Sequence, residues 1–318
     1  MNDDRPRIFF IGSYMHAFVL RAPRFPRDGE TVFGTDSEIG PGGKGSNQAI
    51  AAARLGADVD MLACVGADSF GDEARQLWQA EGINPRWIHV DPERASGMAF
   101  IMVNEQGQNR IIVNPGANDT LTARHADEAE DAIAQANVLV AQFESPVRVV
   151  ERALELARRH GARTILNPAP ARDVSDSLLS LVDVITPNEA EAQALAGLSE
   201  DSFTAEAAAR ALRERGVEIV VLTLGESGAY VFDDAGGRPV PGIHVPAVDT
   251  TGAGDAFTGA LAVALARRWS IDQATSFANL GGAFCVTRPG VVPGLGLERE
   301  LLSLRKPGDR VSPTVGGA

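Results

Sequence analysis

The chain has 318 residues, of which 44% are hydrophobic and 22% are charged, a composition typical of a soluble globular protein rather than of a disordered or fibrous one. Its formal net charge of -13 argues against nucleic acid or an anionic membrane as a partner, because both are themselves negatively charged. The two cysteines, Cys64 and Cys285, lie far apart and outside any metal-ligand spacing, which indicates a reduced, cytoplasmic setting without a disulfide framework or a zinc site.

Short apolar runs alternate with longer amphipathic segments along most of the chain, a pattern typical of parallel strands joined by helices. The first apolar run, 8–20, is too short to span a bilayer and lacks a cleavage site, so its first half is expected to be a buried strand. Strands are expected at 8–11, 59–64, 138–141, 164–166, 184–186 and 219–224. Helices are expected at 46–55, 147–160, 188–195, 205–215, 255–266 and 272–286. The pattern predicts one α/β domain over residues 1–318.

Two stretches interrupt this alternation. Residues 30–39, and the pair 98–103 and 110–113 around a turn, are typical of antiparallel ribbons with no helix to cover them. They predict a small sheet, formed from about 14–40 and 96–114, that acts as a lid over a site or pairs with a second subunit. The segment 306–318 is rich in Pro, Gly and Ser and is expected to be a disordered tail.

The segment 249–257, DTTGAGDAF, places two carboxylates on either side of a small-residue turn that runs into a predicted helix. A helix start offers unpaired amides and the positive end of the helix dipole, and glycines let a phosphoryl group approach those amides closely. The carboxylate of Asp255, ordinarily ionised at neutral pH, stands beside them and could accept a proton from an alcohol. Alternatively, Asp255 is only a helix N-cap and the glycines only form a turn.

A second glycine-rich segment, residues 40–48, also precedes a predicted helix and fits the pattern G-x-G-x-x-G. No buried strand precedes it and no acidic residue ends the following strand, which argues against a dinucleotide-dependent oxidoreductase. It is not a Walker loop either, because Gly45 follows Lys44. The segment therefore predicts a close-approach loop with one cation and one amide side chain, suited to a polyhydroxylated ligand.

Residues 42–48, GGKGSNQ, and 249–257 resemble the N-terminal and C-terminal signatures of the ribokinase (PfkB) family of carbohydrate kinases. Shorter motifs follow in the family's order at 116–118, 142–146, 166–170, 186–189 and 223–225. The resemblance covers 7–302 and implies a ribokinase-like α/β fold, a central mostly parallel sheet flanked by helices, with a small β-sheet lid. It also implies ATP-dependent phosphorylation of a primary hydroxyl of a small sugar, in a homodimer that pairs through the lid.

The resemblance also implies roles for single residues. Asp255 would be the general base, and the anion hole would consist of the amides of Gly252, Ala253, Gly254 and Asp255. The sugar pocket would be lined by Gly43, Lys44, Asn47 and Glu144. Asn188 and Glu191 would organise Mg²⁺ and the phosphates, and the nucleotide would lie along Gly254, Thr223, Gly225 and Asn279. Alternatively, Asn188 is a helix cap, Glu191 a solvated helix residue and Glu144 a helix-start residue.

A potassium site is implied beside the anion hole, formed by the Asp249 side chain and the carbonyls of Thr251, Cys285, Arg288 and Gly290. Gly294 stands where family members often have serine. This departure puts the strength of cation binding in doubt.

After the first strand the family pattern G-S-x-N-x-D supplies two polar sugar ligands, whereas this chain has Met15 and Ala17 at those places. A sugar hydroxyl buried there without a partner would cost about 1–3 kcal/mol. We therefore hypothesise an acceptor other than plain ribose. Methionine resembles deoxyribokinases and suits 2-deoxyribose, although those enzymes keep the aspartate that Ala17 replaces.

Two other functions compete with a sugar kinase. A nucleoside kinase on the same fold would need an apolar slot for the base, which Tyr14, Met15 and Phe100 could form. A non-catalytic nucleotide or sugar sensor would be expected to have a damaged catalytic loop, and the loop 249–257 is intact.

Overall fold

The computed structural model describes residues 5–305, and the predicted tail 306–318 lies outside them. Its centre is a nine-stranded sheet in the order β13-β12-β11-β10-β9-β8-β1-β4-β5. The strands are β1 (Arg7–Ile11), β4 (Asp58–Gly66), β5 (Ile88–Asp91), β8 (Val138–Gln142), β9 (Arg163–Asn167), β10 (Val184–Ile185), β11 (Ile219–Thr223), β12 (Gly228–Asp233) and β13 (Gly236–Pro241). All neighbours from β5 to β11 pair in parallel, and β12 and β13 add antiparallel pairings at one edge. The predicted mostly parallel sheet is therefore confirmed.

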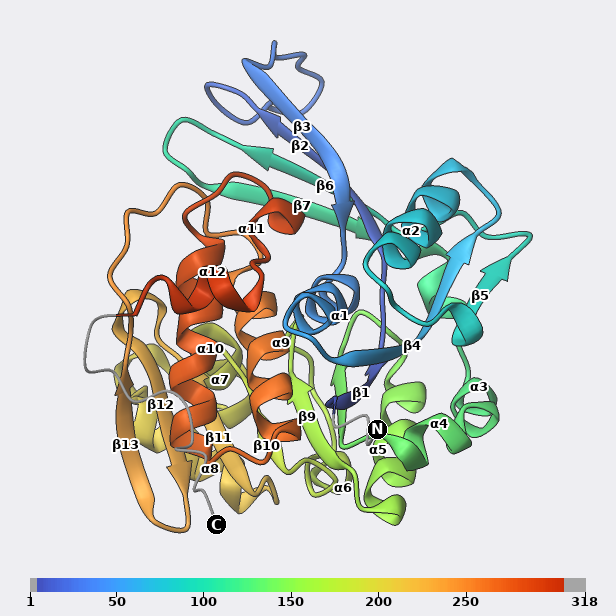
Figure 1. The fold of residues 1–318 in the computed structure, drawn as a ribbon. Coiled ribbons are helices and arrows are strands. Elements are labelled where there is room, and N and C mark those ends of the chain that lie inside the picture. The colour runs from blue at the N-terminus through green and yellow to red at the C-terminus, as the bar shows by residue number, and fades with distance from the viewer. Residues whose placement is uncertain (1–4, 306–318) are drawn as a thin grey trace.

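Helices cover both faces of this sheet (Figure 1). One face carries α1 (Lys44–Arg54), α2 (Ser69–Ala80), α9 (Ala253–Ala266) and α10 (Ile271–Cys285), with the short α11 (Val291–Gly294) and α12 (Glu298–Leu302) beyond them. The other face carries α3 (Ala123–Glu128), α4 (Glu130–Gln135), α5 (Val147–His160), α6 (Asp176–Leu179), α7 (Glu189–Ala196) and α8 (Ala205–Glu214). In β1, Ile8 and Phe10 enter one apolar core while Phe9 and Ile11 enter the other. Burial on both faces explains why the strands are continuous apolar runs.

Four single-turn 3-10 helices lie in the connections of the described chain. They are η1 (Pro85–Trp87), η2 (Gly116–Thr120), η3 (Glu200–Ser202) and η4 (Gly225–Ser227). The last of them places Gly225 directly after β11, at the carboxyl edge of the sheet, where parallel α/β sheets bind their ligands.

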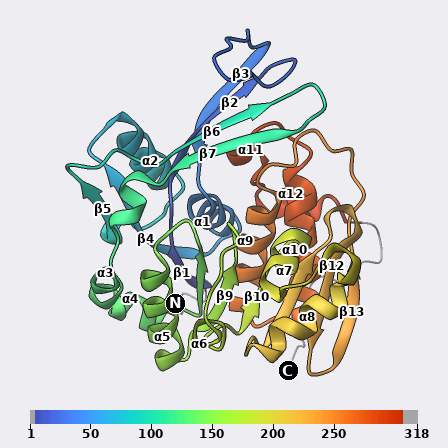
Figure 2. The ribbon, with the colours of Figure 1, turned by 180° about the vertical axis from the view of Figure 1, so that it is seen from behind.

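A second, four-stranded sheet in the order β3-β2-β6-β7 stands off the main one (Figures 1 and 2). Its strands are β2 (Met15–Arg21), β3 (Asp36–Gly42), β6 (Met98–Val103) and β7 (Asn109–Asn114). Each hairpin is antiparallel, but β2 pairs with β6 in parallel, which the sequence pattern did not indicate. The strand expected at 30–39 begins only at Asp36, and residues 30–35 form no strand.

Helices α1 and α9 both begin at glycines that no side chain caps. Gly43 precedes α1 with φ 99°, and Gly252 precedes α9 with φ 81°, backbone conformations that favour glycine. The two helices begin at Lys44 and Ala253, two residues before the expected starts. They also pack closely, since a Cβ on Gly259 would lie 2.7 Å from the Cβ of Ala51. The start of each helix therefore reaches the same edge of the main sheet.

Candidate active site

Asp255 lies at the third position of α9 and is 6% exposed. Asn47 Nδ2 donates to Asp255 Oδ2 at 2.8 Å, and Gln48 Nε2 donates to Oδ1 at 3.0 Å. The N-cap position belongs to Gly252, so the interpretation of Asp255 as an N-cap is wrong. Both carboxylate oxygens are instead held by the side-chain amides of the fourth and fifth residues of α1.

The backbone amides that begin α9 are mostly without acceptors. In residues 5–305 no carbonyl or side chain accepts a hydrogen bond from the N–H of Gly252, Gly254 or Asp255, whereas Ala253 N–H donates to the Thr250 carbonyl at 3.3 Å. Unpaired N–H groups at a helix start attract anions. Three of the four predicted amides are thus free for an anion, and that of Ala253 is engaged.

A cavity of about 150 Å³ opens beside Asp255. It brings together residues that the sequence places far apart: Lys44, Asn188, Glu191, Thr223, Gly252, Ala253 and Gly254. Burial lowers the pKa of the Lys44 ammonium, but the charges of Asp255, Glu144 and Glu191 outweigh it and raise that pKa overall. Lys44 therefore stays protonated and supplies positive charge to the cavity.

Glu144 lies at the beginning of α1, although it comes from the segment after β8. Its Oε2 accepts hydrogen bonds from Ser13 Oγ and from the backbone N–H of Lys44, each at 2.7 Å. Burial raises the pKa of the Glu144 carboxyl, and the Lys44 charge and these hydrogen bonds oppose that rise. The helix that follows is capped at Pro146, so Glu144 is not its first residue.

Met15 and Ala17 lie on the face of the small sheet that is turned toward the loop around Gly290. They pair with Gly42 and Gly40 of β3 and alternate with His16, whose ring stacks on Phe70 of α2 at 4.0 Å. On their own face, the Glu38 Oε1 atom would lie 3.0 Å from a Cβ on Gly290. The predicted apolar pair is therefore on the side of the small sheet that faces the start of α11 rather than α2.

Two further predicted sugar residues lie at the start of α1. A Cβ on Gly43 would lie 2.7 Å from the Ser13 carbonyl, so glycine is required for the close approach of this loop to the end of β1. Asn47 Oδ1 is buried without a hydrogen-bond partner in the described chain. Since buried acceptors are normally paired, this oxygen is suited to a ligand hydroxyl.

A larger cavity of about 420 Å³ shares residues with the first and extends away from it. It contains the predicted nucleotide residues Asn188, Thr223, Gly225, Gly254 and Asn279. Its walls are otherwise largely apolar, as an aromatic base requires. The Asn279 side chain donates to the carbonyls of Val240 and Pro241 at 3.2 and 2.9 Å and so fixes the end of β13 against α10.

Asn188 and Glu191 form a reciprocal capping box at the start of α7. Asn188 Oδ1 accepts from the Glu191 N–H at 2.8 Å, and Glu191 Oε2 accepts from the Asn188 N–H at 2.9 Å. The alternative interpretation of Asn188 as a helix cap is thus correct in geometry. Glu191 is not simply solvated, because burial raises the pKa of its carboxyl and it lines the smaller cavity. The second oxygen of Glu191 remains available to a ligand.

The predicted potassium residues come from the loop before α9 and from the end of α10 with the loop that follows it. Asp249 accepts the backbone N–H of Thr251 at 2.9 Å and of Gly290 at 3.0 Å; burial raises the pKa of this carboxyl, but these bonds outweigh burial and lower it. The Cys285 carbonyl accepts the Arg288 N–H at 3.4 Å. A Cβ on Gly294, the last residue of α11, would lie 2.8 Å from that same carbonyl, so a serine there would require the backbone to shift.

Residues 5–295 match the pfkB family carbohydrate kinase profile. The chain belongs to the pfkB family of carbohydrate kinases. It is 40% identical to a ribokinase of Haemophilus influenzae over 299 residues, covering 94% of this chain and 98% of the relative. It is 36% identical to a deoxyribokinase of Salmonella typhi over 304 residues, covering 94% and 99%. The structure of Arabidopsis thaliana ribokinase complexed with ribose and ATP aligns with a TM-score of 0.86 at 26% identity, covering 94% of this chain and 98% of that one.

Two residues of this pfkB kinase that the sequence analysis did not assign lie beside the predicted base. Gln48 contacts Asp255 directly, and Asn167, the last residue of β9, accepts a hydrogen bond from Gln48 Nε2 at 3.0 Å. Both belong to motifs used for the resemblance, 42–48 and 166–170. Both are polar residues at the end of a buried helix or strand, and this feature of the sequence could have marked them as site residues.

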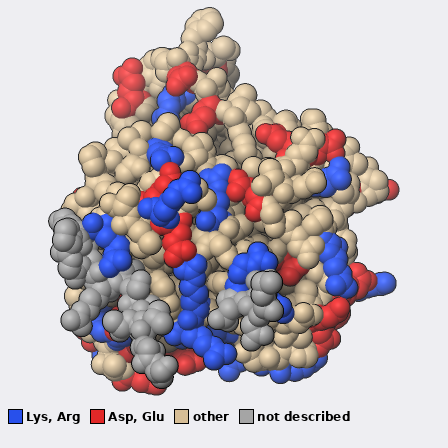
Figure 3. All heavy atoms as spheres, viewed as in Figure 1, with Lys and Arg blue, Asp and Glu red and all other residues tan. Residues whose placement is uncertain are grey.

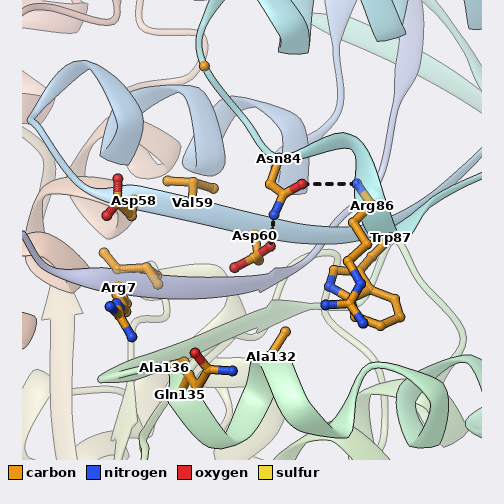
Figure 4. Close-up of a pocket in the computed structure, with 12 residues that line it drawn as sticks. Arg7, Asp58, Val59, Asp60, Asn84, Arg86, Trp87, Ala132, Gln135 and Ala136 are labelled. Carbon is orange, nitrogen blue, oxygen red and sulfur yellow. Dashed lines mark hydrogen bonds between the residues drawn. The ribbon is translucent and has the colours of Figure 1, made fainter.

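A separate hollow of about 340 Å³ lies at the opposite, amino edge of the main sheet (Figure 4). It contains none of the predicted site residues. Its acidic groups have partners, because Asn84 donates to Asp60 at 2.7 Å and Arg5 pairs with Asp58 at 2.9 Å. The candidate site is therefore the one at the carboxyl edge, where ligands of open α/β sheets bind.

Proposed function

We propose that this pfkB kinase transfers the γ-phosphoryl group of ATP to a primary hydroxyl of a small sugar, with Asp255 as the general base. The observation that carries the proposal is the position of the Asp255 carboxylate at the start of α9, beside three amides that have no acceptor within residues 5–305. Asp255 takes the hydroxyl proton, the sugar oxygen forms a bond to the γ-phosphorus, and the bond to the leaving ADP oxygen breaks. The amides of Gly252, Gly254 and Asp255 stabilise the negative charge spread over the transferred group.

The larger cavity would hold the nucleotide, and magnesium would accompany its phosphates. Between residues 5 and 305, no group of three or more His, Cys, Asp or Glu side chains could hold a metal ion. Mg²⁺, which keeps several waters and binds substrate phosphates, therefore fits this site only through ATP and water, beside Asn188 and Glu191. When bound, it would neutralise phosphate charge during transfer.

We further propose that a potassium ion binds beside the anion hole. The donors would be a carboxylate oxygen of Asp249 and the carbonyls of Thr251, Cys285, Arg288 and Gly290, an all-oxygen set suited to a hard cation. The observed bonds from Thr251 and Gly290 to Asp249 bring the two loops together. A bound cation would fix the loop that carries the amides of α9.

We propose that the acceptor is a sugar with no hydroxyl on the side that contacts Met15 and Ala17, such as 2-deoxyribose. Replacing Ala17 with Asp should raise kcat/KM for ribose by about 10-fold or more, because it supplies the partner that a buried hydroxyl needs. Assays of ADP release with ribose and 2-deoxyribose would measure this change. Val19→Asp, which adds the same charge further along β2, is the control. A wild-type enzyme that used ribose at least as well as every deoxy, keto or modified sugar would refute the proposal.

The alternative, a nucleoside kinase, depends on a slot formed by Tyr14, Met15 and Phe100, and the structure does not form it. Tyr14 is fully buried with its ring edge-on to Trp78 at 5.8 Å. Phe100 stacks on Phe18 at 5.0 Å, on the opposite face of the small sheet from Met15. The interpretation of these three residues as one slot is wrong, which favours a small sugar.

We also propose that the small sheet is a lid and that two copies pair through its outer face. Leu20, Ile39, Phe100 and Ile112 lie on that face and are 49%, 61%, 44% and 67% exposed. Figure 3 shows uncharged residues at the tip of the projecting sheet, with several acidic and basic side chains below the tip and over the rest of this side of the molecule. An apolar surface of this kind is typical of an interface.

Dimerisation can be tested by placing charge on the outer face. Ile112→Asp together with Ile39→Asp should convert a dimer to a monomer in sedimentation velocity, because each buries an unpaired carboxylate in the interface. Glu105→Asp in the β6–β7 turn is the matched control and should leave the mass unchanged. A wild-type chain that sediments as a monomer at every concentration would contradict the interface.

No helix in the described part of the chain is long and apolar enough to cross a membrane. Both cysteines are free thiols. Free thiols are typical of a reducing compartment, so we propose that the enzyme is cytoplasmic.

A further inference from the structure

We propose that Gln48 and Asn167 are positioning residues that orient the Asp255 carboxylate for proton transfer. This inference rests on the proposed function, in which Asp255 is the base, and extends it to two residues without an assigned role. Neither residue is proposed to touch the reacting atoms. They would act on the reaction through Asp255 alone.

The orientation of these side-chain amides can be deduced from the Thr186 main-chain carbonyl, which can only accept hydrogen bonds. Asn167 Nδ2 donates to the Thr186 carbonyl at 2.9 Å, so Asn167 Oδ1 must point the other way. That oxygen accepts from Gln48 Nε2 at 3.0 Å, and the same Nε2 donates to Asp255 Oδ1 at 3.0 Å. The direction of every bond in the series is therefore fixed from the Thr186 carbonyl to the base.

The whole series lies in the interior, at the carboxyl ends of β9 and β10. The side chains of Gln48, Asn167 and Thr186 are buried together with Asp255. Thr186 Oγ1 lies 3.2 Å from Thr258 Oγ1 on α9, so the helix that carries the base is linked to the same strand end. Hydrogen bonds in such an environment are stronger than in water and hold one geometry.

Asn47 and Gln48 hold different oxygens of Asp255 and differ in what else they can bind. Asn47 Oδ1 and Gln48 Oε1 both lack a partner in the described chain, but Gln48 is 0% exposed against 4% for Asn47, and both Nε2 hydrogens of Gln48 are committed to protein acceptors. With one hydrogen bond on each oxygen, the carboxylate cannot rotate, and one lone pair of each oxygen remains to take a proton. Gln48 is thus expected to matter for turnover rather than for binding.

The charge of Asp255 acts on other ionisable groups that face it from several elements. They are Lys44 on α1, Glu144 before α5, Glu191 on α7 and Cys285 on α10. A test at residue 48 leaves all of them in place. Any change in the pH dependence of kcat can then be assigned to the new group at that position.

The test compares Gln48→Glu with Gln48→Met across the pH range. Gln48→Glu places a second carboxylate beside Asp255, and two adjacent carboxylates hold a proton more tightly than one. The acid limb of the kcat profile should move up by at least about one pH unit, with partial recovery of kcat at high pH. Gln48→Met keeps the length but removes both donors, and should lower kcat about 10-fold to 100-fold while KM for ATP stays within about twofold.

Gln142→Met is the matched control, since it removes a buried amide that donates to the Ile11 carbonyl and is not bonded to Asp255. It should lower Tm without moving the acid limb. If Gln48 has a purely structural role, Gln48→Glu should lower kcat by the same factor at every pH, or Gln48→Met should retain at least half of the wild-type kcat. Either result overturns the inference. If Gln48→Glu does not fold, Gln48→Met decides alone. If Asp255→Asn remains active, the proposed function itself is wrong. If Asp255→Asn is inactive but the substitutions of Gln48 leave kcat and its pH dependence unchanged, only the inference about Gln48 is wrong.

Discussion

Asp255→Asn is expected to lower kcat by about 100-fold to 10,000-fold while ATP affinity stays nearly unchanged. The amide has nearly the shape of the carboxylate but cannot take the hydroxyl proton. The backbone N–H groups of Gly252 and Gly254, which are free in residues 5–305, would remain to hold the phosphates. Single-turnover rates and calorimetric titration with ATP would separate chemistry from binding.

The control for this variant is another aspartate in a first helical turn. Asp272 lies in the first turn of α10 and pairs with Arg238 at 2.8 Å, outside both cavities at the carboxyl edge. Asp272→Asn should retain full kcat. Near-normal turnover by Asp255→Asn would remove Asp255 from the mechanism.

Gly254→Ala should raise stability and yet lower turnover about 100-fold. Gly254 is inside α9, and no atom lies within 4 Å of the position that its Cβ would take, because that position faces the cavity. Alanine is favoured over glycine in a helix by about 0.5–1 kcal/mol, so Tm should rise. The same methyl group would keep a phosphoryl group from the amides of Gly254 and Asp255.

Thermal melts and kcat measured on the same preparation test this pair of opposite effects. Gly282→Ala provides the comparison, since its Cβ would meet its nearest neighbour, the Ala253 carbonyl, at an ordinary 3.4 Å and face the nucleotide cavity instead. It should alter KM for ATP more than kcat. Unchanged kcat in Gly254→Ala would show that phosphate does not approach this turn.

Six parallel strands of the main sheet were predicted because their burial leaves a direct pattern in the sequence, and so were six of its helices, namely α1, α5, α7, α8, α9 and α10. The apolar run of β1, for example, serves two cores at once. The hairpin β12–β13 was not predicted, since β13 contains Gly236, Pro239 and Pro241, residues that are tolerated on an edge strand but disfavoured in a central one. The early starts of α1 and α9 were missed because glycine rather than a capping side chain precedes them.

The candidate site was predictable where one short segment carries several of its groups, as in 249–257. Contacts between distant segments were not. Gln48 is 207 residues from Asp255, and no pattern in the sequence indicates that the starts of α1 and α9 lie side by side. The opposite faces taken by Met15 and Phe100 likewise depend on the parallel register of β2 and β6, which only the assembled sheet defines.

The most direct measurement is a crystal structure of the enzyme with ADP, aluminium fluoride and a sugar, a complex that imitates the transferring phosphoryl group. The account predicts a primary hydroxyl about 3 Å from an Asp255 carboxylate oxygen, with the fluoride facing the N–H groups of Gly252, Gly254 and Asp255. A hydroxyl held instead by Glu144, or fluoride bound away from the start of α9, would contradict it.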